Sequence, residues 1–154
     1  MKPVLRSLAI LASVWSLQGC GGGEPGGAFV FNAFVGLWVN GCERNTVTGG
    51  SERVHIRLTE LSSTSLSGSF AVTTYTSTDC SGPPSSTVQF AIVQNGTQSM
   101  SGDTVIQITI AGDSGSSRND LLSVRNHTLY LGNAIIGPNG YPTAIDFSRP
   151  LGRI

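Results

Sequence analysis

Strict alternation of apolar and polar residues is the feature that most constrains the fold of this 154-residue chain. It is clearest in residues 53–61, where Val54, Ile56 and Leu58 share one face and polar residues occupy the other. A period of two with one apolar face is typical of a β-strand that is buried on one side only. After residue 33 no segment shows sustained helical spacing, so the sequence predicts an all-β domain.

Short segments of this kind follow one another along the chain and are separated by turn signals. We expect eight strands, at 34–39, 53–61, 65–76, 87–93, 104–111, 120–125, 128–132 and 144–147. The turn signals are Asn40-Gly41, Asn95-Gly96, Asn126-His127 and the Gly/Pro-rich stretches, with 99–103 as the tip of a longer connection. Sequential hairpins without helices favour a small antiparallel up-and-down barrel, with a β-sandwich as the alternative.

The alternation also predicts which side chains face the interior. The expected inward residues are Leu66, Gly68, Phe70 and Val72, then Val88, Phe90 and Ile92, then Ile106, Ile108 and Ile110. Gly68 could mark a bulge or bend. A barrel of about eight strands is either filled by side chains or holds one small ligand. Trp38, Phe70, Phe90 and Tyr130 are candidates for a cavity wall, although the same residues would equally fill a solid core.

The first 19 residues read as an export signal. Lys2 and Arg6 give a positive start, a short and mostly apolar run covers residues 8–17, and small Gly19 precedes Cys20. About ten such residues are too few to cross a bilayer, which requires roughly 20. We therefore expect residues 1–19 to be a signal peptide and not a retained membrane helix.

Leu17-Gln18-Gly19-Cys20 resembles the lipobox of bacterial lipoproteins. The resemblance implies that the Cys20 thiol receives a diacylglycerol, that the signal is cut before it, and that the new amino end is acylated. Residues 20–33, with the glycine run that begins at Gly21, would then be a tether. Gly21 after the cysteine favours the outer membrane of the bacterial cell envelope. The alternative is an ordinary secretory signal with a chance cysteine.

The cysteine count agrees with this interpretation. The chain has three cysteines, which is an odd number for an exported protein. If the lipid uses Cys20, then Cys42 and Cys80 remain as a pair in an oxidising compartment, where disulfides persist. A metal or redox pair is the alternative, which the absence of a C-x-x-C spacing and of a nearby histidine disfavours.

Gly36-Leu37-Trp38 looks like the G-x-W opening of lipocalin-like barrels, in which the matching tryptophan plugs the closed end. Most of the mature chain is similar to a group of small, uncharacterised bacterial lipoproteins. The shared features are the G-x-W start with a cysteine soon after, the turn Asp79-Cys80-Ser81-Gly82, TLYLGN at 128–133 and YPTAIDF at 141–147. The resemblance implies a lipid-anchored barrel domain over residues 34–154, with no known activity to carry over.

Charge excludes one class of partner. Lys2 is the only lysine and would leave with Arg6 in the signal, so the mature chain is mildly acidic. No basic patch remains to neutralise phosphates, and nucleic acid is therefore not an expected partner. Asp146 and Arg149 are expected to form a structural ion pair near the barrel seam.

The sequence gives no reason to expect an enzyme. Residues 112–115 (GDSG) match the nucleophile string of chymotrypsin-like proteases, but Ser116 replaces the following glycine and no histidine has a matching context. A turn between strands explains the same residues. His55 and His127 are isolated, so we expect no metal site, no catalytic residues and no cofactor.

Two function classes follow from these observations. The first is a membrane-anchored binding module whose barrel takes a small apolar or amphipathic ligand. The alternative is a structural or protein-interaction lipoprotein of the envelope with a filled barrel and no ligand. The sequence leaves protein partners open.

Overall fold

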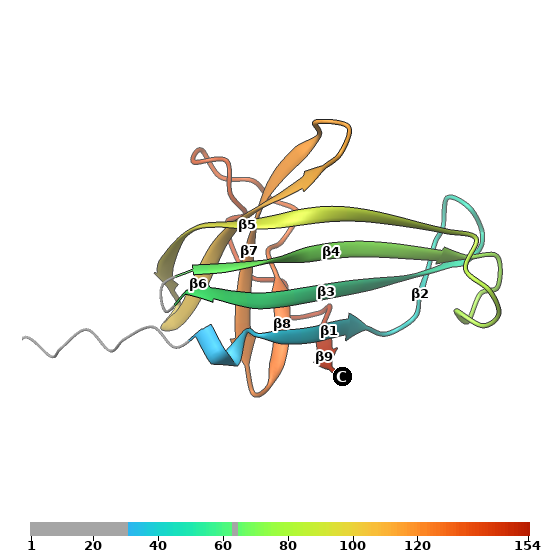
Figure 1. Cartoon of the computed structure of the whole chain (residues 1–154), viewed down its shortest axis with the longest axis horizontal. Helices are drawn as coiled ribbons and strands as arrows, with labels where there is room; N and C mark the ends of the chain where they lie inside the picture. The colour runs from blue at the N-terminus through green and yellow to red at the C-terminus, as the bar shows by residue number, and fades with distance from the viewer. Residues whose placement is uncertain (1–30, 63–64) are drawn as a thin grey trace, which may run out of the picture.

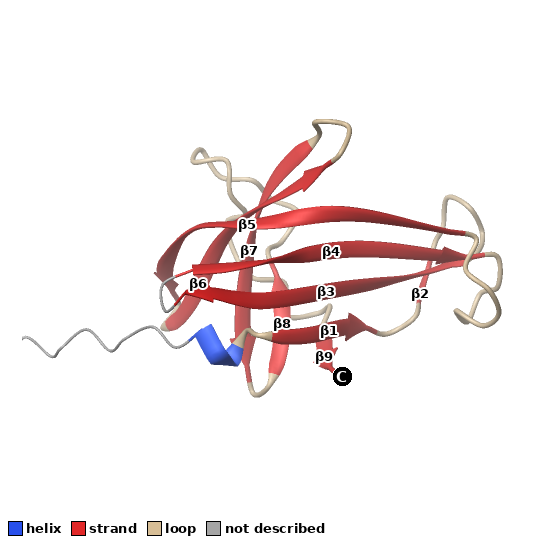
Figure 2. Cartoon of the chain, in the orientation of Figure 1, coloured by secondary structure: helices blue, strands red, loops and turns tan. Residues whose placement is uncertain are grey.

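Nine β-strands make up most of residues 31–62 and 65–154, which are the residues that the computed structural model describes (Figures 1 and 2). A 3-10 helix, η1 (Phe31–Ala33), precedes them. The strands are β1 (Gly36–Asn40), β2 (Glu43–Arg44), β3 (Ser51–Ser62), β4 (Ser65–Tyr75), β5 (Ser86–Met100), β6 (Asp103–Gly112), β7 (Ser117–Arg125), β8 (Thr128–Leu131) and β9 (Leu151–Arg153). The expected signal peptide, Cys20 and most of the tether lie outside the described residues.

The sheet closes on itself because β1 pairs with both β3 and β9. Trp38 lies opposite Ile56 of β3 on one edge and opposite Arg153 of β9 on the other. From β3 to β9 each strand pairs antiparallel with the next along the chain. The result is an eight-stranded up-and-down barrel with β2 as an additional short strand on β3, which confirms the predicted barrel over the sandwich.

One half of the barrel interior is filled with side chains. Alternation sends one face of each strand inward, as expected, and inner residues of neighbouring strands pair directly, as Ile106 does with Leu122. The buried core consists of Phe31, Phe34, Trp38, Ile56, Leu58, Leu66, Phe70, Ile92, Ile106, Ile108, Ile110, Leu122, Leu129 and Leu151. Val88 also pairs on this face, with Val72, but it is 52% exposed because it lies close to the start of β5.

Trp38 of β1 is fully buried. The 3-10 helix η1 lies beside the start of this strand (Figure 1). Its indole Nε1–H donates a hydrogen bond of 2.7 Å to the carbonyl oxygen of Phe34, so its polar atom is satisfied. The Arg153 guanidinium stacks over the ring at 5.2 Å from its centroid, and Arg153 also donates to the Val35 carbonyl. These contacts join the start of the domain to its last strand.

Two turn and strand predictions were wrong. Asn95-Gly96 is not a turn, because β5 continues through it with a bulge in its pairing to β6. The chain reverses instead at Ser101-Gly102, where both residues have the positive φ that a tight turn requires. Residues 144–147 do not form a strand; Ile145 makes only an isolated bridge, and the last strand is β9.

Gly68 marks neither a bulge nor a bend in β4. The β3–β4 register is continuous through the Gly68–Leu58 pair. A Cβ atom at Gly68 would lie 2.0 Å from the Arg57 carbonyl oxygen, so glycine permits a close approach of the two backbones.

The predicted disulfide joins Cys42 to Cys80, with a Cα–Cα distance of 5.8 Å. It links the segment after β1 to the β4–β5 loop across the start of β3. Ser51 supports this loop from a fully buried position: its Oγ accepts a 2.9 Å hydrogen bond from the Cys80 amide and donates one of 2.8 Å to the Ser77 carbonyl. The covalent bond and these contacts fix the same end of the barrel.

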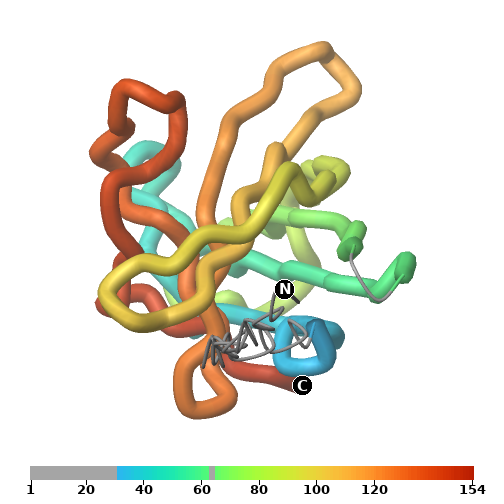
Figure 3. The backbone as a smooth tube through the Cα atoms, turned by 90° about the vertical axis from the view of Figure 1, so that its left-hand side faces the viewer, coloured from blue at the N-terminus to red at the C-terminus, as the bar shows by residue number. Residues whose placement is uncertain are grey.

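Figure 3 shows that the β6–β7 hairpin (orange) and the connection between β8 and β9 (red) project on the same side of the barrel. This connection covers residues 132–150, since β8 ends at Leu131 and β9 begins at Leu151. Within the described part of the chain, no helix is long and apolar enough to cross a membrane.

Candidate ligand-binding site

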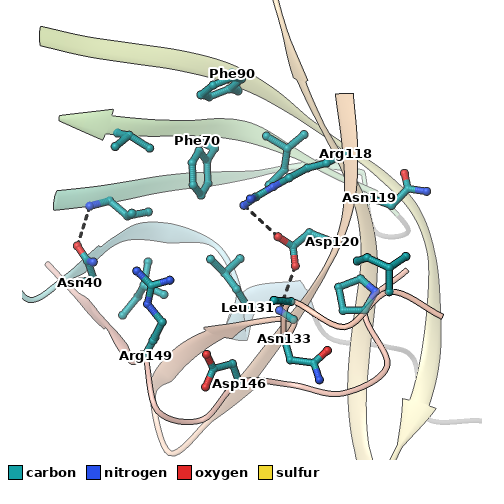
Figure 4. A pocket seen from close by; sticks show the side chains of 18 of the residues that line it. Asn40, Phe70, Phe90, Arg118, Asn119, Asp120, Leu131, Asn133, Asp146 and Arg149 are labelled. Atoms are coloured by element: carbon teal, nitrogen blue, oxygen red, sulfur yellow. Dashed lines mark hydrogen bonds and ion pairs between the residues drawn. The ribbon is translucent and has the colours of Figure 1, made fainter. Parts of the chain in front are cut away.

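A cavity of about 780 Å³ lies in the half of the barrel nearer the disulfide, where Asn40, Glu43 and Glu52 are among its lining residues. Figure 4 shows the side chains that line it. Its apolar lining residues are Val54, Phe70, Val72, Phe90, Ile110, Leu131, Ile136, Pro142 and Leu151. Polar residues share the wall, and they include Asn40, Glu43, Glu52, Arg118, Asn119, Asp120, Asn133, Asp146 and Arg149. Apolar walls with a few convergent polar groups are the usual composition of a small-molecule site.

The cavity exists because two strands stop short on one side of the barrel. Leu131 is the last residue of β8 and Leu151 the first of β9, so inward side chains from these strands end here. The wall is completed by residues 132–150, which connect the two strands. Hydrogen bonds hold this connection in place, among them Asn133 N to the Ala144 carbonyl at 2.8 Å and Asp146 N to the Leu131 carbonyl at 2.9 Å.

Asp120 places a carboxylate in the inner wall of the cavity, where the residue is only 5% exposed. Its Oδ1 accepts hydrogen bonds from the amides of Leu121, at 2.8 Å, and Gly132, at 3.0 Å. Desolvation of the charged form raises the pKa of Asp120, and these two amides with the Arg118 charge oppose the rise only in part.

Arg118 lies two residues before Asp120 and shares its face of β7. One guanidinium nitrogen lies 3.2 Å from Asp120 Oδ2, and the guanidinium carbon lies 5.4 Å from the centroid of the Phe70 ring. Phe70 in turn packs edge to face against Phe90, with 5.9 Å between ring centroids. Arg118 remains 59% exposed, so it covers Asp120 from the solvent side of the cavity.

A second ion pair joins Arg149 to Glu43. Arg149 donates to both carboxylate oxygens of Glu43, and Asn40 Nδ2 donates to one of them at 2.7 Å. Asn40 Oδ1 accepts from the Val54 amide at 2.6 Å, which ties the pair to β3. The hydrogen bond from Arg149 lowers the pKa of Glu43. The structure therefore ties the β8–β9 connection to β2 at the rim of the cavity.

The expected pairing of Arg149 with Asp146 is replaced by this contact. Asp146 instead accepts hydrogen bonds from the Ser148 hydroxyl at 2.6 Å and from its amide at 2.9 Å. Ser148 is two residues from Asp146 in the sequence and therefore lies within reach of its carboxylate. Glu43 is distant from Arg149 in the sequence, and only the closure of the barrel brings these two side chains together.

The four aromatic residues proposed from sequence as cavity wall divide into two pairs. Phe70 and Phe90 line the cavity. Trp38 and Tyr130 do not: Trp38 lies in the filled half, and Tyr130 packs on Phe147 with ring centroids 5.0 Å apart. Tyr130 sits between two inward residues of β8, so the period of two turns its side chain to the outer face.

The Arg118–Asp120 pair was missed at the sequence level. The sequence pattern predicts a strand that begins at Asp120, whereas β7 begins at Ser117. The available signal was the period of two, since Arg118, Asp120 and Leu122 share one face of this strand. Two charged residues on an inner face obscured the pattern.

The remaining polar candidates are dispersed. His55 lies on β3 and His127 in the β7–β8 turn, and burial lowers the pKa of His55. Ser114 lies in the exposed β6–β7 turn, where its hydroxyl is 3.1 Å from that of Ser116. Across residues 31–62 and 65–154, no three His, Cys, Asp or Glu side chains gather as a metal site would require.

Comparison with known proteins does not assign a function to this chain. Comparison of the chain with protein-family models, with curated proteins and with solved structures found no match. The barrel and its cavity therefore carry the functional assignment.

The Glu43–Arg149 pair predicts a pH-dependent contribution to stability. The folded-state pKa of Glu43 lies below its ordinary value of 4.5, so the stabilisation is complete above that pH and is lost as the pH falls through the folded-state pKa. We expect Glu43→Gln to lower the free energy of unfolding by about 0.5–1 kcal/mol at neutral pH, and by less below pH 4.5.

Urea unfolding of the full chain across this pH range measures the effect. Asp113→Asn, in the exposed β6–β7 turn, is the matched control and should change little at any pH. A Glu43→Gln difference that stays constant from neutral pH to well below 4.5 would contradict the ion-pair assignment.

Proposed function

We propose that this protein is a lipid-anchored binding module of the bacterial cell envelope, whose barrel takes one small amphipathic ligand into the cavity between the filled core and the disulfide end. The single observation that supports this most strongly is the cavity itself. Its volume of about 780 Å³ falls within the range of small-molecule sites, which is roughly 300–1,000 Å³.

The contrast between the two halves of the barrel supports a binding role. Around Trp38 the inner side chains of Ile56, Ile106 and Leu122 are fully buried, so side chains fill this half of the barrel. Beyond Ile110 and Leu131 the inner wall stays apolar but is left uncovered. Apolar surface exposed to water is unfavourable by about 25 cal/mol per Å², and a ligand that covers it would recover this free energy.

The polar groups in the wall support an amphipathic ligand over a purely apolar one. The Asp120 carboxylate lies deep in the wall beneath the exposed Arg118, and the Glu43–Arg149 pair lies at the rim. A hydrocarbon would desolvate these ion pairs further without adding a hydrogen bond to them, which is costly. A ligand with a polar headgroup would add such a bond.

The proposed anchor rests on the sequence around Cys20, which lies outside the described residues. Two or more acyl chains give stable membrane attachment, whereas a single chain is marginal. The Cys42–Cys80 disulfide is consistent with an oxidising compartment outside the cytoplasm. The glycine-rich segment from Gly21 has the composition of a flexible linker between the proposed anchor and the barrel.

Native mass spectrometry of the mature protein, purified from its own envelope, tests the ligand. We expect a reproducible additional mass that leaves on denaturation. Val72→Trp, which places a large side chain in the cavity, should abolish this mass. Ala71→Trp is the matched control, because the neighbouring residue of β4 faces outward, and it should retain the mass.

Thermal unfolding of both variants establishes that they fold, and Val54→Phe provides a second way to fill the cavity. A clean ligand-free mass from gently handled wild-type protein would overturn the binding proposal and favour a structural or protein-interaction role. Retention of the mass in both cavity-filling variants would place the ligand elsewhere.

Cell fractionation tests the anchor independently. Cys20→Ser should release the protein from the membrane fraction, because the acylated thiol is lost. The Cys42→Ala/Cys80→Ala double variant controls for cysteine removal in general and should stay membrane-bound. Continued membrane attachment of Cys20→Ser would refute lipidation at this residue.

A further inference from the structure

We infer that the ligand carries a cationic amine headgroup, which takes the position that the Arg118 guanidinium occupies between the Phe70 ring and the Asp120 carboxylate. This inference rests on the proposed function, because it names the chemical class of the ligand for the same cavity. Arg118 then acts as an internal occupant that the ligand displaces.

The position of the Arg118 guanidinium has the composition of a cation site. An aromatic face lies on one side, with 5.4 Å from the guanidinium carbon to the Phe70 centroid, and a carboxylate oxygen of Asp120 lies 3.2 Å from a guanidinium nitrogen on the other. Aromatic faces and carboxylates are the two groups that proteins combine to bind organic ammonium ions. Figure 4 shows the guanidinium, Phe70 and Asp120 together at the centre of the cavity wall.

Asp120 is fixed and retains capacity for a ligand. Its side chain is 8% exposed, and Oδ1 is held by the amides of Leu121 and Gly132. The hydrogen bonds to this carboxylate therefore leave Oδ2 facing the Arg118 cation. Gly132 is part of the arrangement, because a Cβ there would come within 2.9 Å of Asp120 Oδ1 and 2.4 Å of Pro142 Cγ.

Arg118, by contrast, can leave at small cost. Its side chain is 59% exposed and belongs to the second residue of β7, beside the β6–β7 turn. A long arginine side chain this exposed can move its charge into water, and the incoming ammonium then pairs with the buried Asp120 carboxylate in its place. A ligand with an ammonium headgroup and an apolar chain would also bury that chain in the cavity. Burial of apolar surface is favourable, and the Arg118 side chain does not supply this contribution.

The charge of the cavity favours a cation over an anion. Four carboxylates line it, those of Glu43, Glu52, Asp120 and Asp146, against two guanidinium groups. Arg149 is already held by Glu43, so displacement of Arg118 would leave the deep part of the cavity negative. A negative cavity favours a ligand of positive charge, whereas a carboxylate headgroup would be repelled by the carboxylates in the deep part of the cavity. Val54, Val72 and Phe90 provide the apolar surface for the rest of the ligand.

Three probes with the same chain length separate the headgroups: n-octylamine, n-octanol and octanoate. We would measure their affinity for the full chain, freed of envelope material, by isothermal titration calorimetry at pH 7. We expect octylamine to bind about tenfold or more tightly than octanoate, which corresponds to about 1.4 kcal/mol. Octanol should lie between the two.

Variants then test the shared site. Arg118→Gln should raise the affinity for octylamine by about tenfold, because the internal competitor is gone, whereas Asp120→Asn should lower it by at least the same factor. Arg125→Gln is the matched control: this exposed arginine of β7 pairs with Asp103 and does not line the cavity. Far-ultraviolet circular dichroism checks the fold, and Arg118→Lys, which keeps the cation, should stay close to wild type.

The outcomes separate this inference from the proposed function. If octanoate binds more tightly than octylamine, or if Arg118→Gln fails to increase octylamine affinity, the cationic class is wrong while the binding role stands. If no probe binds and the envelope-derived protein carries no additional mass, both proposals fail. A structural role for Arg118 alone predicts weaker binding or lower stability in Arg118→Gln, never a gain in amine affinity.

Discussion

β1 is hydrogen-bonded along both of its edges, to β3 on one side and to β9 on the other. This closure leaves the eight-stranded sheet without a free edge, and it forces one face of every strand toward a common interior. Trp38 of β1 belongs to the filled half, with its indole N–H satisfied by Phe34 and its ring covered by Arg153. Loss of β1 pairing would therefore open the barrel and remove both the core and the cavity.

Closure alone would permit a solid barrel, and the cavity comes from unequal strand lengths. β3, β4 and β5 extend well beyond the filled core, while β8 and β9 are short and are joined by residues 132–150. Gly132 lets this connection approach Asp120 closely, and the Glu43–Arg149 pair holds its far end to β2. The Cys42–Cys80 bond stabilises the same end. The parts of the chain that shape the cavity are thus held by polar and covalent contacts, because little core exists there to hold them.

Alternation predicted the architecture well, since a period of two is a property of each strand alone. The inward faces, the Asn126-His127 turn with positive φ at both residues, and the disulfide partners all followed from local patterns and cysteine count. The turn predicted at Asn95-Gly96 is absent, because the residues that favour a turn are also accommodated in a β-bulge. The Arg149–Glu43 and Arg118–Phe70 contacts could not be derived, because each joins residues that only the closed barrel brings together. The candidate site was therefore less predictable than the fold around it.

The central claim is that the uncovered half of the barrel holds a small molecule. Methyl nuclear magnetic resonance of the full chain during titration with n-octanol tests it directly, and a neutral headgroup keeps the result independent of ligand charge. We expect saturable shifts of the methyl groups of Val54, Ile110 and Leu131, which line the cavity, and unchanged signals from Ile106 and Leu122 in the filled half. Unchanged cavity methyls, or equal shifts in both halves, would contradict it.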